Sequence, residues 1–259
     1  MQTDAAGTVS IGAARLRGVR RALVALRVVH PFPTLANALA TLLMGLIASR
    51  GSAPAGRLLL IALTMLAIQC AIGATNDAVD APLDAASKPW KPIVAGALSR
   101  RAAAVVAMLA ALVGMLLAAT AGPAAWALAV LGLACGIAYD LRLKRSPLAP
   151  LPYLLAFVLY PLWVWTALGR FTAALLWEAP LALLLGAALY LGNTAPDLAA
   201  DQAAGVRGLA HRLGLRRTLV LCWLGFAVAL GAATPIAALA GYRIELVAGA
   251  SAFAAAPSV

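Results

Sequence analysis

The sequence predicts an all-α, polytopic membrane protein with about eight transmembrane helices. Of its 259 residues, 64% are hydrophobic and only 11% are charged, whereas about a quarter of the residues of a soluble domain carry charge. Long apolar runs approach the ~20 residues that a helix needs to cross a bilayer. The charged residues gather between these runs, which indicates alternating membrane spans and polar loops.

The first 30 residues are expected to form a basic amphipathic segment ahead of a transmembrane domain spanning 31–259. Five arginines are interleaved with apolar residues there, namely Arg15, Arg17, Arg20, Arg21 and Arg27. A helix with this pattern suits the surface of an anionic membrane. The segment runs into Pro31 and Pro33 without a small-residue cleavage site, which argues against a cleaved signal peptide. Basic residues that face an anionic membrane surface account for the net charge of +11, so no nucleic-acid partner is expected.

The candidate spans follow one another with short connections. In order they lie near residues 33–49, 57–75, 103–121, 124–139, 149–168, 173–193, 218–240 and 244–258. The last run is short and starts beside Glu245, so it carries the weakest signal.

The distribution of basic residues predicts the orientation in the plasma membrane. With the N-terminus in the cytoplasm, 16 of the 20 lysines and arginines fall on the inner side, as the positive-inside rule requires. The acidic residues after spans two, four and six fall on the same side, so the polar chemistry is concentrated on the cytoplasmic face.

Two aspartate motifs carry the strongest functional signal. Asp77, Asp80 and Asp84 have i, i+3, i+7 spacing and fall within about 60° of one another on a helix. Asp197 and Asp201, at i and i+4, also share a face. Clustered carboxylates at a membrane helix end are unfavourable unless a cation compensates them. Mg²⁺, held by carboxylate oxygens and substrate phosphate, is the natural candidate.

Basic residues surround both motifs and suit a phosphorylated ligand. They are Lys88, Lys91, Arg142, Lys144, Arg207 and Arg212. Carboxylates interleaved with such donors indicate a diphosphate bridged by metal. Taken singly, an inner-loop lysine or arginine is also a topology signal, and a lone aspartate at a helix start, such as Asp197 after Pro196, is also an N-cap.

The motifs resemble those of the UbiA superfamily of intramembrane prenyltransferases. "NDAVDAPLDAASKPWKPIVAGAL" from residue 76 resembles the NDxxDxxxD signature with its basic-Pro extension. "DLAADQAAGVRGLAHRLG" from residue 197 resembles the second motif, DxxxD. "YDLRLKRSP", residues 139–147, resembles the Tyr-to-Lys segment between the fourth and fifth spans. The three occur in the family's order, across most of the chain.

The resemblance implies site residues by position. It gives a catalytic, metal-binding role to Asp77, Asp80, Asp84, Asp197 and Asp201. It gives substrate binding to Asn76, Lys88, Lys91, Tyr139, Arg142, Lys144 and Arg207. The implied fold has usually nine helices around a central cavity with a cytoplasmic cap. Two positions depart from the family: Thr194 where many members have another Asp, and Lys91 where many have Arg.

The resemblance implies Mg²⁺-dependent transfer of a prenyl group from a polyprenyl diphosphate to an aromatic, quinone-precursor acceptor or to a lipid acceptor. The aromatic acceptor is the superfamily's commonest case, and the segment "YDLRLK", which is somewhat similar to archaeal-type geranylgeranylglyceryl phosphate transferases, keeps a lipid acceptor open. A UbiA-type terpene cyclase would use the same diphosphate chemistry without an acceptor. A transporter is a third reading, although its polar groups would lie nearer the bilayer midplane. His211 is either a general base for the acceptor or, as we favour, a loop-packing residue.

Overall fold

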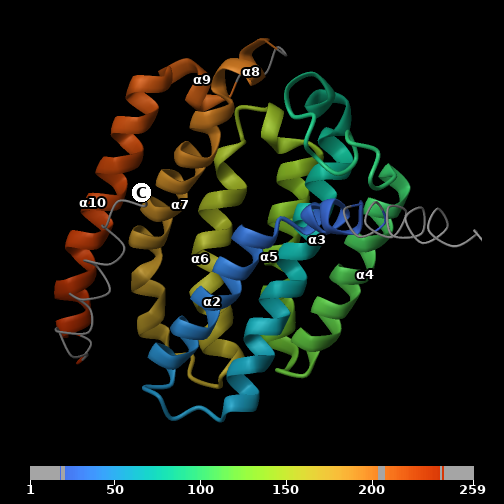
Figure 1. Ribbon diagram of the computed structural model, residues 1–259. Helices are drawn as coiled ribbons and strands as arrows, with labels where there is room; N and C mark the ends of the chain where they lie inside the picture. The colour runs from blue at the N-terminus through green and yellow to red at the C-terminus, as the bar shows by residue number, and fades with distance from the viewer. Residues whose placement is uncertain (1–17, 19–20, 204–207, 240, 242–259) are drawn as a thin grey trace, which may run out of the picture. The chain divides into compact units, whose positions relative to one another are not determined.

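The structure is a computed structural model that describes residues 18, 21–203, 208–239 and 241. The described residues are helical, and in chain order the principal helices are η1 (Leu26–Val29), α2 (Pro31–Ala48), α3 (Ala55–Ser87), α4 (Arg100–Ala119), α5 (Pro123–Leu141), α6 (Pro150–Ala167), α7 (Ala179–Thr194), α8 (Leu198–Ala203), α9 (Leu209–Leu213) and α10 (Leu215–Leu239). The short 3₁₀ helices are η2 (Leu143–Arg145), η3 (Ala173–Glu178) and η4 (Ala195–Asp197). The all-α prediction is confirmed (Figure 1).

Seven of these segments are long and apolar enough to cross a membrane, and they match the first seven predicted spans. The predicted span at 244–258 lies outside the described residues, as do Arg15, Arg17 and Arg20 of the basic N-terminal segment. Many leucines on these helices are solvent-exposed, including Leu43 at 51% and Leu116 at 61%. A bilayer, unlike water, accommodates such surfaces without cost.

The chain folds into two compact units. The first comprises Met1–Leu141 with Pro161–Phe171, and the second comprises Arg142–Tyr160 with Thr172–Val259. The division falls within α6 at Pro161. Proline lacks the N–H that a helix interior needs, so this is a natural point for the helix to change partners.

Helix α3 is the centre of the first unit and packs against α2, α4 and α5. Its 33 residues correspond to about 50 Å of helix, well beyond the ~30 Å hydrocarbon core of a bilayer. The apolar run ends near residue 75, whereas the helix continues to Ser87 (Figure 1). The polar end of α3 therefore extends past the apolar layer and carries the first aspartate motif.

Small residues allow close helix packing in both units. In the first unit, a Cβ on Gly114 of α4 would meet Ile68 and Ala67 of α3 at 3.3–3.4 Å. In the second, a Cβ on Gly186 of α7 would lie 2.8 Å from the Tyr153 carbonyl oxygen of α6. Such backbone approach is typical of membrane helix interfaces.

Candidate functional site

The first aspartate motif forms a buried carboxylate cluster on α3. Asp77, Asp80 and Asp84 lie on one face of the helix, and their residues are only 2%, 4% and 5% exposed. The shared helical face predicted from their spacing is thus confirmed. Burying carboxylates is costly unless they are paired or bind a metal, so the partners of this cluster define the site.

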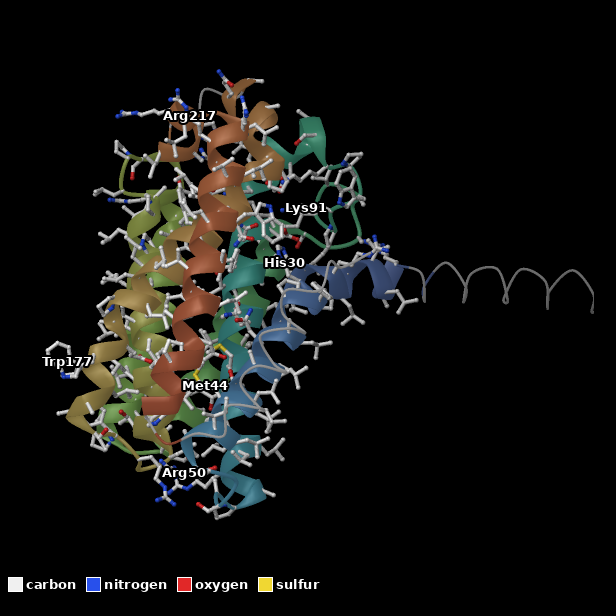
Figure 2. The ribbon with its side chains drawn as sticks, turned by 90° about the vertical axis from the view of Figure 1, so that its left-hand side faces the viewer. His30, Met44, Arg50, Lys91, Trp177 and Arg217 are labelled. Atoms are coloured by element: carbon white, nitrogen blue, oxygen red, sulfur yellow. The ribbon has the colours of Figure 1, made fainter. Side chains whose placement is uncertain are left out.

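Lys91 reaches into the cluster from the loop after α3. Turns between residues 88 and 98 fold this loop back, with the amides of Ala97 and Leu98 both donating to the Pro92 carbonyl. The Lys91 ammonium Nζ then lies 2.8 Å from Asp77 Oδ1 and 2.7 Å from Asp84 Oδ2. Lys91 and His30 are both labelled in Figure 2. Lys88 Nζ is more distant, at 3.9 Å from Asp84. Burial lowers the pKa of Lys91, but the hydrogen bonds to the two aspartates outweigh it and raise that pKa above its usual value.

Asn76 joins Asp80 to a fourth carboxylate. Its side-chain amide donates to Asp80 Oδ2 at 3.1 Å and to Asp140 Oδ1 at 2.9 Å. Asp140 lies near the end of α5 and is 6% exposed. From the sequence it is either a helix-end residue or an acceptor-placing residue. Near the end of α5, its contact with Asn76 also joins it to the first carboxylate cluster.

His30 also belongs to this cluster, although the sequence gives no signal that assigns it there. It lies between η1 and α2, and its Nε2 is 3.0 Å from Asp77 Oδ1. Forty-seven residues separate the two positions, and the packing of η1 and α2 against α3 brings them together. A polar residue directly before the Pro31 that starts the first span is the one feature that could have drawn attention to it.

The cluster offers carboxylate oxygens, the donor type that suits a hard divalent cation. Asp77 Oδ2 is buried and receives no hydrogen bond from the described residues. Carboxylate oxygens are the ligands that Mg²⁺ prefers. No three acidic, histidine or cysteine side chains within the described residues are close enough together to hold a metal ion, and Lys91 Nζ bridges Asp77 and Asp84. A cation shared by those two carboxylates would thus compete with the Lys91 ammonium.

The second motif lies in the second unit. Asp197 ends η4 and is half-buried, and Asp201 lies on α8. Just ahead of them, Asn193 donates to the Tyr153 hydroxyl at 2.9 Å. Thr194, where many family members have Asp, turns its hydroxyl back to the Tyr190 carbonyl at 2.8 Å.

The remaining predicted residues lie in the connections. Tyr139 is near the end of α5, Arg142 follows that helix and is exposed, and Lys144 lies on η2. Arg207 lies outside the described residues. At the start of α9, His211 Nδ1 accepts a hydrogen bond from the Gly208 amide at 3.1 Å.

Comparison with known proteins identifies related sequences. The UbiA prenyltransferase family profile matches residues 38–259. A digeranylgeranylglyceryl phosphate synthase from Methanoregula boonei is 29% identical over 208 residues, which cover 79% of this chain and 74% of the relative.

Solved structures share the fold. A UbiA homologue from Archaeoglobus fulgidus bound to DMAPP and Mg²⁺ superposes with a TM-score of 0.72 at 20% identity, covering 88% of this chain and 82% of that one. The same homologue bound to GPP and Mg²⁺ gives a TM-score of 0.71 at 20% identity, with 89% and 82% coverage. At this level of identity the likeness establishes the helical architecture.

Proposed function

The chain belongs to the UbiA prenyltransferase family and is a transferase of prenyl groups, and from this premise we propose that it transfers the prenyl chain of a polyprenyl diphosphate to a glycerol-phosphate lipid with Mg²⁺ as cofactor. The observation that carries the proposal is the buried cluster of Asp77, Asp80, Asp84 and Lys91 at the polar end of α3. Buried carboxylates beside a partly buried ammonium suit a ligand that is both metal-bound and anionic.

Each group has a distinct proposed role. Asp77, Asp80 and Asp84 of the first motif, and Asp197 and Asp201 of the second, are each proposed as Mg²⁺ ligands. When bound, the metal offsets the charge that develops on the departing diphosphate. Lys91 directs Nζ at two carboxylates, and because an ammonium has three N–H donors, one remains for a phosphate oxygen. Lys88 and, in the other unit, Arg142, Lys144 and Arg207 are proposed as further phosphate donors.

The proposed reaction exchanges one C–O bond for another. The bond between the allylic carbon and the diphosphate oxygen breaks, and its electron pair leaves with the diphosphate. A lipid hydroxyl oxygen forms the new bond to that carbon, and its proton leaves with the diphosphate. Apolar helices around the prenyl chain would exclude water from the allylic cation.

The lipid acceptor is favoured over the aromatic one by the relatives. Digeranylgeranylglyceryl phosphate synthases from Methanoregula boonei and Thermococcus gammatolerans match this chain at 29% identity. The "YDLRLK" segment is somewhat similar to the corresponding segment of such lipid transferases and is compatible with the same acceptor class.

Diphosphate release by the purified protein in detergent tests the proposal. Geranyl, farnesyl and geranylgeranyl diphosphate would each be supplied with and without Mg²⁺. Each would be tested alone, with a geranylgeranylglyceryl phosphate acceptor, and with a phenolic acceptor. We expect release that requires both Mg²⁺ and the lipid. Release that requires the phenol would indicate an aromatic prenyltransferase, and a cyclic hydrocarbon formed without acceptor would indicate a cyclase.

Removing one proposed ligand from each motif tests the metal roles. Asp77→Asn and Asp201→Asn should each lower Mg²⁺-dependent release by about 100-fold, equivalent to roughly 3 kcal/mol of lost transition-state stabilisation. Glu178→Gln is the matched control, because Glu178 ends η3 and is a carboxylate outside both motifs. Full turnover by either aspartate variant, at normal expression, would contradict the metal assignment.

A further inference from the structure

His30 adopts a strained backbone conformation where η1 ends and α2 begins. Several hydrogen bonds hold this turn at Val29 and His30, which we call the corner. The φ of 49° and ψ of 66° of His30 are left-handed, a region that non-glycine residues seldom occupy. Its amide donates to the Arg27 carbonyl at 2.9 Å, and its carbonyl accepts the Thr34 amide at 3.1 Å. The Thr34 hydroxyl holds the preceding carbonyl, that of Val29, at 2.6 Å. Strain of this kind persists only where the surroundings impose it, and such strain clusters at functional sites.

A glycine on helix α3 allows this corner to pack closely against the helix. A Cβ on Gly73 would lie 3.3 Å from the backbone C and O of Val29 and from His30 Cγ, so glycine permits the close approach. Gly73 is one turn before Asp77 on α3. Docking the corner at Gly73 therefore brings the imidazole to the carboxylate one turn further along the helix.

The contacts to Asp77 fall on only one of its two oxygens. His30 Nε2 and Lys91 Nζ both lie against Oδ1, at 3.0 and 2.8 Å. Asp77 Oδ2 is buried and receives no hydrogen bond within the part of the chain that the structure describes. An ionised carboxylate only accepts hydrogen bonds, so the imidazole donates through Nε2–H. Turning the carboxylate away from this orientation would lengthen both contacts at once.

We propose that His30 is a positioning residue that fixes the Asp77 carboxylate, so that Oδ2 is presented to the divalent cation. The proposal rests on the proposed function, which makes Asp77 a metal ligand. Partners that orient a metal-ligating group typically change metal affinity by 10–100-fold when they are removed. His30 does not contact the reacting atoms in this proposal, so its removal should raise the Mg²⁺ requirement more than it lowers the maximal rate.

Manganese binding measures this role directly. The probe is Mn²⁺ alone, titrated into the detergent-solubilised full-length protein, with free Mn²⁺ followed by electron paramagnetic resonance. His30→Ala should weaken Mn²⁺ binding by about 10–100-fold, and His30→Gln, which retains an N–H donor of similar reach, should stay within about threefold of wild type. In turnover, His30→Ala should raise the Mg²⁺ concentration for half-maximal rate while kcat at saturating Mg²⁺ changes little.

Thr34→Val is the matched structural control. It removes the hydroxyl that holds the Val29 carbonyl and loosens the same corner without removing the donor to Asp77. We expect it to lower the melting temperature but to leave Mn²⁺ affinity within about threefold of wild type. Equal weakening in Thr34→Val and His30→Ala, or wild-type affinity in His30→Ala, would overturn the positioning role. A wild-type protein without Mg²⁺-dependent diphosphate release would instead overturn the proposed function.

Discussion

At the scale of single residues, Lys91 has two competing roles. Its ammonium bridges Asp77 and Asp84 at 2.8 and 2.7 Å, so it neutralises charge in the same place where a metal would. The side chain is 16% exposed, against 2% and 6% for the two aspartates. Lys91 thus acts as an internal counterion for the carboxylates, and the proposed Mg²⁺ would take over part of that task.

Replacing Lys91 should make the folded protein depend on divalent cations. Lys91→Met leaves two buried carboxylates without their shared cation, which costs about 3–5 kcal/mol for a buried pair. We expect a lower melting temperature in chelator, and a Mg²⁺-induced rise in melting temperature larger than that of wild type. Lys88→Met is the control, because Lys88 Nζ is 3.9 Å from Asp84 and should have a smaller effect. An unchanged response of Lys91→Met to Mg²⁺ would contradict the counterion role.

Residue spacing predicted part of this site and could not predict the rest. The one-face arrangement of Asp77, Asp80 and Asp84 follows from helical periodicity alone. His30 and Asp140 lie 47 and 64 residues from their partners. No local pattern encodes such pairings, because they arise only when α2 and α5 pack against α3.

At the scale of elements, α3 continues through a proline that sequence rules would treat as a helix end. Pro82 has no N–H, so the Ala78 carbonyl one turn earlier loses its helical partner. The guanidinium of Arg100, at the start of α4, donates to that carbonyl through Nε at 2.6 Å. Arg100 therefore supplies the hydrogen bond that Pro82 omits, and keeps Asp80 and Asp84 on a continuous helix. From the sequence alone, Arg100 is explained only as an inner-loop topology signal.

A double-mutant cycle tests this compensation. Arg100→Ala should destabilise the protein by about 1–3 kcal/mol, because a buried carbonyl is left unsatisfied. Pro82→Ala restores an N–H to the helix, so Arg100→Ala should cost less in that background, with a coupling of about 0.5–3 kcal/mol. Thermal unfolding in detergent measures both. Arg101→Ala, at the exposed neighbouring position, is the control. Strictly additive effects of the two substitutions would exclude the compensation.

At the scale of the whole molecule, hydropathy predicted the fold class and the first seven spans to within a few residues, apart from the polar extension of α3. It succeeded because lipid imposes the same requirement on every spanning segment. Each must be an apolar helix that forms all of its backbone hydrogen bonds internally. Hydropathy gave no indication of the division into two units, because that depends on which helices pack together. The orientation in the membrane stays a prediction based on the positions of the basic residues.

Cysteine accessibility in intact cells tests that orientation. Ser52 lies in the loop between α2 and α3, which the prediction places outside, and Ser146 lies between α5 and α6, which it places in the cytoplasm. In a background lacking Cys70, Cys135 and Cys222, a membrane-impermeant maleimide should label Ser52→Cys in intact cells and Ser146→Cys only after permeabilisation. This labelling pattern is expected from the positive-inside rule, because the predicted orientation puts 16 of the 20 basic residues on the cytoplasmic side. The reverse labelling pattern would place the aspartate motifs outside the cell, away from a cytoplasmic supply of prenyl diphosphate.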